Sequence, residues 1–243
     1  MKQLRLWLVL AGLAGLLPFR SGAAEKEPSM QEFMQLARRK NQFATYAKLQ
    51  GVLQHRRRGK AVVSMPVYFG VILHPDRTIG QLVLDNSEGY MLGQAVNSGL
   101  TSVTPMPGQK SDKLGYVGLR ASDLTLSFLF CQPEKEFANE NVGGVVPCRV
   151  IQLDDPAHKE KIKVWIAREH CFPMQAEFFR YGEKDSYRVL EASGFTKKND
   201  LYYVRKLRIE GPGWRTKIDF DADSAEIGKA DLAKPPKIIM KLK

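Results

Sequence analysis

The sequence predicts an α+β protein that is mainly β and is built around one antiparallel sheet. In the second half of the chain, short segments that alternate between polar and apolar residues recur about every dozen residues, with turn residues between them. One apolar stripe of helical spacing precedes these segments and begins at Met30. A sheet of this kind has one apolar and one polar face. The 243 residues suffice for one large domain with a substantial core.

The N-terminus has the three parts of a secretory signal peptide. Lys2 and Arg5 give it a positively charged start, an almost unbroken apolar run covers residues 6–17, and small residues occupy positions 21–24. The apolar run is shorter than the roughly 20 residues that a helix needs to span a bilayer. A retained membrane anchor is the alternative interpretation. Leu16 stands where a lipoprotein leader would have its acylated cysteine, which argues against a lipid anchor.

We therefore expect residues 1–24 to be a signal peptide, cut after Ala23 or Ala24, and residues 25–243 to form a single domain. No later segment of the sequence is apolar enough to cross a membrane. The predicted location is the periplasm, where the domain is expected to be soluble once the signal peptide has been removed.

The chain is basic, with 37 Lys and Arg against 26 Asp and Glu and a net charge of +11. A positive surface favours nucleic acid, anionic lipid headgroups or an acidic protein as partners. Export makes nucleic acid the least expected of these, so we predict a lipid, an anionic membrane surface or an envelope protein, and no nucleic acid. Cys131, Cys148 and Cys171 are an odd set for an oxidising compartment. One disulfide with a leftover thiol and three buried thiols both remain open.

The first predicted element is a helix. Ser29 can cap its start, and Glu32 three residues later can reach back to complete a capping box. The apolar stripe then predicts a helix from about Met30 to about Phe43 or Lys48. We interpret its apolar face as core rather than as a cofactor site.

From Gln50 onward the period changes to two, which predicts strands. The alternation is clearest over residues 67–73, and Gly80–Leu84 and Gly89–Val96 are two further short strand candidates. Residues 98–113 are rich in Gly, Pro, Ser and Thr, and their two prolines cannot continue a helix or a central strand. This segment is predicted to be a mobile loop.

The segment Ala121–Phe130 is ambiguous. Its apolar residues from Leu124 alternate like a strand, yet Leu124, Phe128 and Cys131 also fit one face of a helix. Asp123 is well placed near a helix N-terminus, which favours a short helix.

The second half predicts a meander, in which each strand is followed by a tight turn and its antiparallel neighbour. The tail after residue 222 is charged and ends in a strand-like piece. The predicted strands are Val142–Leu153, Lys161–Ile166, Met174–Phe178, Ser186–Phe195, Leu201–Ile209, Trp214–Phe220 and Lys237–Leu242.

Enzyme motifs are missing from the sequence. It contains no Gly-rich phosphate loop, no HExxH and no GxSxG. The histidines His55, His74, His158 and His170 occur singly and are interpreted as solvated surface residues. His170 adjoins Cys171, but neighbouring residues on a strand point to opposite faces, so a catalytic pair is not expected. We predict a protein that is not an enzyme and has no cofactor, no catalytic residue and no metal site.

A succession of short motifs runs through most of the chain after the leader. They are Gly118-Leu119, Ser122–Leu124, Phe128–Phe130, Cys148–Val150, Lys163–Glu169, Phe172–Glu177, Ser193–Lys198, Asp200–Val204 and Gly213–Thr216. This succession resembles the LolA-like family of outer-membrane lipoprotein-sorting proteins. The resemblance implies a strongly curved antiparallel sheet, an incomplete β-barrel, with helices covering its concave face.

The resemblance also implies a function of binding. In the best-understood relatives, the space between sheet and helices takes up lipoprotein acyl chains, and these relatives carry lipoproteins across the periplasm. Other relatives sense envelope stress through protein–protein contacts. The leading hypothesis is thus a periplasmic carrier that binds acyl chains of lipoproteins or other lipids without covalent chemistry. The alternative is an envelope interaction or stress-sensing module without lipid cargo, for which the basic surface and the loop 98–113 provide the motivation.

The candidate ligand-binding residues are apolar side chains of the meander that are expected to point the same way. A concave apolar surface that is left uncovered is where a small molecule binds, whereas a fully covered one is merely core. A hydrolase is retained only as a residual alternative, motivated by His170 beside Cys171. The predicted binding face consists of Val164, Ile166, Met174, Phe178, Val189, Leu207, Ile209, Ile218 and Phe220.

Overall fold

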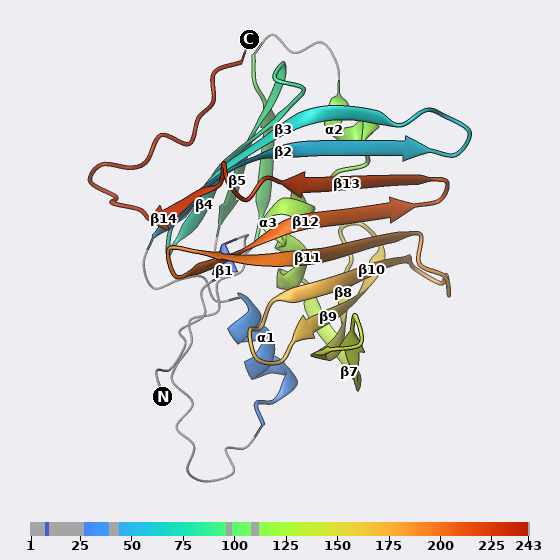
Figure 1. Cartoon of the computed structure of the whole chain (residues 1–243). Coiled ribbons are helices and arrows are strands. Elements are labelled where there is room, and N and C mark those ends of the chain that lie inside the picture. Colours follow the sequence, from blue (N-terminus) through green and yellow to red (C-terminus); the bar gives the residue numbers. More distant parts are fainter. Residues whose placement is uncertain (1–7, 10–26, 39–43, 96–98, 108–111, 243) are drawn as a thin grey trace.

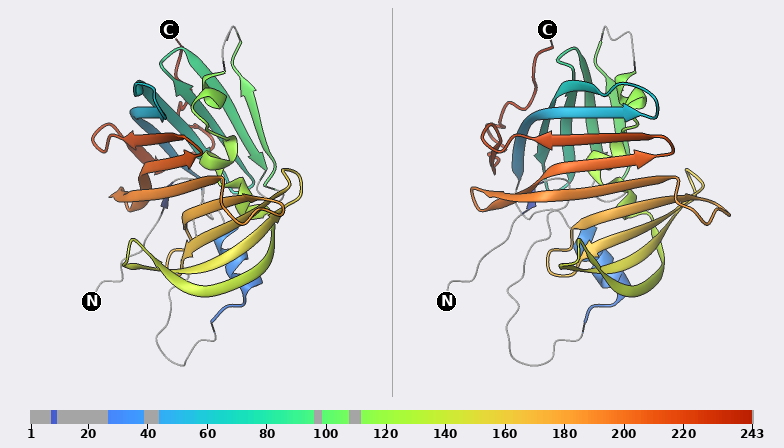
Figure 2. Two further views of the ribbon diagram at one scale, coloured as in Figure 1. Left: turned by 90° about the vertical axis from the view of Figure 1, so that its right-hand side faces the viewer. Right: turned by 45° about the vertical axis from the view of Figure 1, so that its right-hand side comes forward.

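The computed structural model describes residues 8–9, 27–38, 44–95, 99–107 and 112–242. A fourteen-stranded sheet forms its body and curves into an open half-barrel (Figures 1 and 2). The order of the strands is β6-β5-β4-β3-β2-β13-β12-β11-β10-β9-β8-β7, and all neighbours along this path are antiparallel. The predicted fold class, a mainly β protein with a curved antiparallel sheet, is confirmed.

The sheet consists of two consecutive meanders. Their bounds are β2 (Thr45–Arg57), β3 (Val63–Leu73), β4 (Arg77–Leu84), β5 (Glu88–Ala95) and β6 (Thr101–Pro105), and then β7 (Gln132–Val142), β8 (Val146–Asp155), β9 (Glu160–Ala167), β10 (Pro173–Arg180), β11 (Arg188–Lys198), β12 (Leu201–Gly211) and β13 (Trp214–Phe220). The first and last of these strands, β2 and β13, pair with each other and join the two meanders in the middle of the sheet.

Two short strands lie off the main path. β14 (Glu226–Lys229) extends the line of β13 beside β2, and β1 (Leu8–Val9) runs parallel to β12. Apart from Leu8–Val9, the predicted signal peptide 1–24 lies outside the described residues.

The helices are short and lie on the concave side of the sheet (Figure 2). They are α1 (Met30–Arg38), α2 (Lys113–Tyr116), α3 (Ala121–Thr125) and the 3₁₀ helix η1 (Ser127–Phe130). The short helix predicted within Ala121–Phe130 is therefore confirmed. It ends at Leu126, which adopts a left-handed conformation with φ of 53° and turns the chain into η1.

Strands β6 and β7 form the two free edges of the half-barrel, and both discourage pairing with another chain. β6 is only five residues long and ends in Pro105. β7 carries Pro133 and is irregular at two points in its register with β8, between Pro133 and Lys135 and between Phe137 and Glu140. Short strands, prolines and irregular register are common ways of protecting an exposed edge.

The first predicted helix is shorter than its longest predicted extent. α1 begins at Met30, and Ser29 and Glu32 form the predicted capping box, with the Ser29 amide donating to the Glu32 carboxylate at 2.7 Å. The end near Phe43 lies outside the described residues, but the extension to Lys48 is wrong. Residues 45–48 already belong to β2, where pairing with both β3 and β14 outweighs the helical spacing of Ala44 and Ala47.

Three further expectations are corrected. The segment 98–113 was predicted to be a loop but contains β6. Its prolines do not exclude this strand, because a proline is tolerated at a sheet edge. β7 was not expected, since its charged sequence lacks alternation, and residues 143 and 144 form the turn after it. The tail piece Lys237–Leu242 is not a strand. It lies against β3 and β4, where Tyr68 and Gln81 hydrogen-bond its backbone.

Candidate functional site

The predicted binding residues lie together on the concave face, with one exception. Leu207 pairs directly with Ile218, and Phe178 with Ile162, so these side chains share a face across four strands. The Phe128 ring of η1 meets the Phe178 ring edge-on at 5.8 Å between centroids, which identifies this face as the one under the helices. The residues of this face are Val164, Ile166, Met174, Phe178, Leu207, Ile209, Ile218 and Phe220, and all are buried.

The exception is Val189, whose predicted orientation is wrong. It pairs with Glu210 on one side and Glu177 on the other, on the convex face, and is half-buried. Leu190 and Arg188 point into the concave side instead. Alternation along β11 from the buried Leu190 predicts that Val189 points outward. The charged Arg188, which points inward, made this alternation hard to recognise in the sequence.

The concave face is covered by the chain itself. We call residues 113–130, which include α2, α3 and η1, the cover segment; Figure 2 shows it inside the curve of the sheet. Its apolar side chains are packed into the common core. The apolar side chains of the cover segment that are at most 5% exposed are Val117, Leu119, Leu124, Leu126, Phe128 and Leu129.

A buried ion pair attaches the cover segment to β11. Arg188 donates from Nη2 to Oδ2 of Asp123 at 2.5 Å, and the side chains are 3% and 0% exposed. The Asp123 carboxylate also accepts the Arg120 amide at the start of α3. Oδ1 of Asp123 and Nη1 of Arg188 are buried without a hydrogen-bond partner among the described residues. The pair is thus strongly desolvated, and each charge depends on the other.

A second polar attachment lies next to it. Arg120 binds both oxygens of Glu160 on β9, at 3.0 and 3.1 Å, and donates to the Tyr187 hydroxyl at 2.6 Å. Burial opposes the charge of Arg120, but the bonds to Glu160 and Tyr187 prevail and raise its pKa. Burial, followed by the bond to Glu160, raises the pKa of Tyr187. Arg120 therefore stays charged and holds the cover segment by a bidentate contact.

The other end of the cover segment is attached near His55. Contrary to the prediction, His55 is buried. Its Nδ1 lies 2.8 Å from Oγ1 of Thr216, which donates its own hydrogen to the Val117 carbonyl. Nε2 of His55 accepts from Arg57 at 3.1 Å. This network assigns the neutral tautomer with hydrogen on Nδ1. The burial of His55 could not be predicted from the sequence, since its hydrogen-bond partner Thr216 lies 161 residues away along the chain.

Burial, followed by the charge of Arg57, lowers the pKa of His55 below its usual 6.5. The unfolded chain therefore binds a proton at this histidine before the folded protein does. Folding stability contributed by neutral His55 should be complete above about pH 6.5 and should fall as the pH decreases toward the lowered value. Urea unfolding followed by circular dichroism between about pH 7.5 and 5 measures this. His55→Gln should flatten the decrease; an unchanged pH dependence contradicts the assignment. Burial also lowers the pKa of His170, which accounts for a residual slope.

The cysteines offer no nucleophile. All three are free thiols, so the alternative with one disulfide is not realised. Burial raises the pKa of Cys131 to about 12 and that of Cys171 to about 11, so both remain protonated at neutral pH. Among the described residues, no group of three or more His, Cys, Asp and Glu side chains is arranged to hold a metal ion.

The helices in the described part of the chain are all too short or too polar to cross a membrane.

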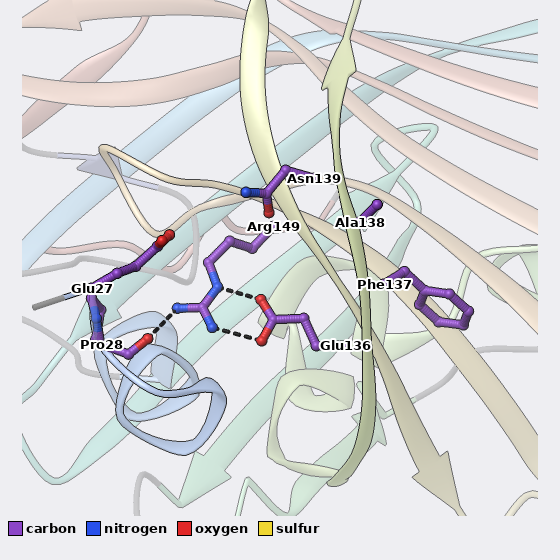
Figure 3. Close-up of a pocket in the computed structure, with 7 residues that line it drawn as sticks. All are labelled: Glu27, Pro28, Glu136, Phe137, Ala138, Asn139 and Arg149. Atoms are coloured by element: carbon purple, nitrogen blue, oxygen red, sulfur yellow. Dashed lines mark hydrogen bonds and ion pairs between the residues drawn. The ribbon is translucent and has the colours of Figure 1, made fainter.

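A polar pocket of about 360 Å³ lies at the edge of the half-barrel, between the start of α1 and strands β7 and β8. Figure 3 shows Arg149 at its base, donating to both oxygens of Glu136 at 2.5 and 2.7 Å and to the Pro28 carbonyl at 2.7 Å. The guanidinium also lies over the Phe33 ring. Because Glu136 neutralises Arg149, the pocket lacks the charge that an anion needs, and its polar lining does not suit an acyl chain.

The chain was compared with protein-family models, curated proteins and solved structures. No protein-family model matches the chain, and no curated protein matches it in sequence. Among solved structures, a DUF1329-family protein from Desulfovibrio piger is 15% identical, with a TM-score of 0.58 over 76% of this chain and 86% of the other. An outer-membrane lipoprotein-sorting protein domain from Vibrio parahaemolyticus is 11% identical, with a TM-score of 0.51 over 81% of this chain and 89% of the other. The chain has the LolA-like fold.

The resemblance inferred from the short motifs is thus confirmed for the fold. A LolA-superfamily protein from Nitrosomonas europaea is 13% identical, with coverages of 87% and 97% and a TM-score of 0.46. In this chain the cover segment, rather than the N-terminal helix alone, occupies the concave face. Sequence analysis identified the face but not the polar contacts that close it, because their members are separated by 40 residues or more.

Proposed function

We propose that this LolA-like protein is a non-enzymatic periplasmic carrier whose concave face binds acyl chains of lipoproteins or other lipids. The observation that carries the proposal is the large apolar part of the concave face of β9 to β13, which short helices of the same chain cover. The N-terminal signal peptide pattern and the fold of an outer-membrane lipoprotein-sorting domain support the location and the class of ligand.

Exchange between the cover segment and a ligand is energetically reasonable. Six buried side chains of the cover segment, at about 2 kcal/mol each, contribute about 12 kcal/mol of apolar burial. An acyl chain of about 16 carbons, at about 0.8 kcal/mol for each methylene, contributes nearly the same. An acyl chain can therefore replace the cover segment on the sheet, whereas opening without a ligand leaves the whole face exposed to water.

The construction of the cover segment favours such an exchange. Its helices are four or five residues long, too short to be stable by themselves, so their structure depends on contacts with the sheet. The attachments at Asp123 and Arg120 are polar and directional. Once these contacts open, apolar burial is what holds the segment on the sheet, and an acyl chain can supply the same kind of burial.

The experiment that tests the proposal is a search for bound amphiphile. Protein purified from the periplasm should carry lipid that native mass spectrometry and solvent extraction detect, and a fluorescent fatty acid should bind saturably. Ile209→Asp should reduce this binding, because it places a charge in the middle of the face. Arg208→Asp, on the convex side of the same strand, is the matched control. Absence of lipid together with non-saturable binding would contradict the proposal.

A further inference from the structure

The tip of the β2–β3 hairpin carries a concentration of positive charge that the carrier proposal does not use. We call the exposed residues Arg56, Arg57, Arg58, Lys60, Val62 and Val63 the hairpin patch. Figure 1 shows this hairpin at one outer end of the sheet, beside the β12–β13 turn. The Arg58 amide donates to the Gly213 carbonyl at 2.7 Å, which ties the two turns together.

The basic side chains of the patch have no acidic partner in the described part of the chain. Arg57 donates to His55 and to the Tyr116 carbonyl, both neutral, and stacks on the Tyr116 ring at 4.6 Å. Among the described residues, Arg56, Arg58 and Lys60 form no ion pair. The patch thus presents four cations within five residues and no compensating carboxylate.

Neighbouring arginines on the convex face behave differently. Arg215, which pairs across the strands with Arg56, forms an ion pair with Glu210 at 2.6 Å. Arg208 has both Glu191 and Glu210 as partners, and Arg205 has Asp219. These three convex-face arginines thus have carboxylate partners close by, unlike the cations of the hairpin patch.

Aliphatic side chains accompany these cations. Val62 is 55% exposed and Val63 is 36% exposed, although valine is usually a buried residue. Tyr116, 44% exposed, adjoins the patch where the Arg57 guanidinium stacks on its ring. Cations beside exposed apolar side chains suit the boundary of a membrane, where phosphates bind the cations and the acyl boundary accepts the apolar groups.

We propose that the hairpin patch docks the protein on an anionic phospholipid surface. Charge complementarity identifies the partner, and the exposed valines favour a lipid surface over an acidic protein. This docking is independent of whether the concave face carries an acyl chain. It places the molecule end-on at the membrane, with the hairpin rather than the convex face in contact.

Sedimentation with lipid vesicles tests the docking. The protein should bind vesicles that contain phosphatidylglycerol, should not bind pure phosphatidylcholine, and should be released by salt, because exposed charges are screened. The variant Arg56→Glu/Arg58→Glu/Lys60→Glu should lower the partition coefficient at least about tenfold. Arg57 is left intact because it packs on His55 and Tyr116.

The matched control changes the same net charge elsewhere. Lys184, Lys234 and Lys241 are exposed and lie outside the patch, and their replacement by Glu should leave vesicle binding nearly unchanged. All variants keep the same N-terminus, and circular dichroism verifies their fold. Equal loss in both triple variants overturns the proposal, because net charge alone then accounts for binding. Absence of vesicle binding with retention of an acidic protein by the hairpin also overturns it. Unchanged fatty-acid binding in the hairpin variant separates this result from the carrier proposal.

Discussion

Replacing Arg188 by alanine should lower the free energy of unfolding by about 3–5 kcal/mol. The change leaves the Asp123 carboxylate, whose side chain is fully buried, without its positive partner. Water cannot reach this site to compensate, so the unpaired charge destabilises the folded state. Equilibrium unfolding in urea, followed by circular dichroism, measures the difference.

Two comparisons make this result specific. The double variant Asp123→Leu/Arg188→Met removes both charges and should be more stable than Arg188→Ala, since apolar residues can replace a buried pair at little cost. Arg208→Ala breaks an ion pair on the convex surface, where the arginine side chain is 40% exposed, and should cost less than about 1 kcal/mol. An Arg188→Ala protein as stable as Arg208→Ala would show that the pair does not hold the cover segment.

Arg120→Ala should raise the apparent affinity for a fatty acid about five- to thirtyfold. The variant removes the bidentate contact with Glu160 and the bond to Tyr187, which weakens closure of the cover segment by about 1–2 kcal/mol. A ligand that binds only the open state gains apparent affinity as that state becomes more populated. Titration with a fluorescent fatty acid at a temperature where the variant remains folded measures the change.

Arg215→Ala is the control for this experiment, because it also removes an arginine with a carboxylate partner but lies on the convex face. It should leave the affinity unchanged. A variant of Arg120 that binds fatty acid no better than the parent protein would show that the cover segment does not limit access. The opposite signs for stability and affinity distinguish a cover that closes a site from ordinary core packing.

The sheet was predictable where its sequence alternates and less so where it does not. The strands from β8 to β13 follow from their period-two patterns and tight turns, because one face of each is buried. β7 was not predicted, because at the edge of the sheet its charged and apolar residues are all partly or fully exposed. Its sequence therefore does not alternate between polar and apolar residues. β6 was hidden by prolines, which an edge strand tolerates.

The candidate site was predictable in its apolar part only. Eight of the nine predicted side chains share the concave face, because parity on a strand is a local property. Val189 failed because Arg188, next to it, is buried inward through an ion pair with Asp123, 65 residues away. Local hydrophobicity carries no information about such a partner. The burial of His55 depends in the same way on Thr216 and on the cover segment.

The junction between β2 and β13 has a consequence for how the molecule matures. Leu53 pairs with Ile218, so the centre of the sheet cannot form until nearly the whole chain has been synthesised. At about 5–20 residues per second, β2 waits many seconds for its neighbour, and contacts so distant along the chain close slowly. Within each meander the strands pair with their neighbours in the sequence, so we expect the two meanders to form first and the β2–β13 junction to close the sheet last.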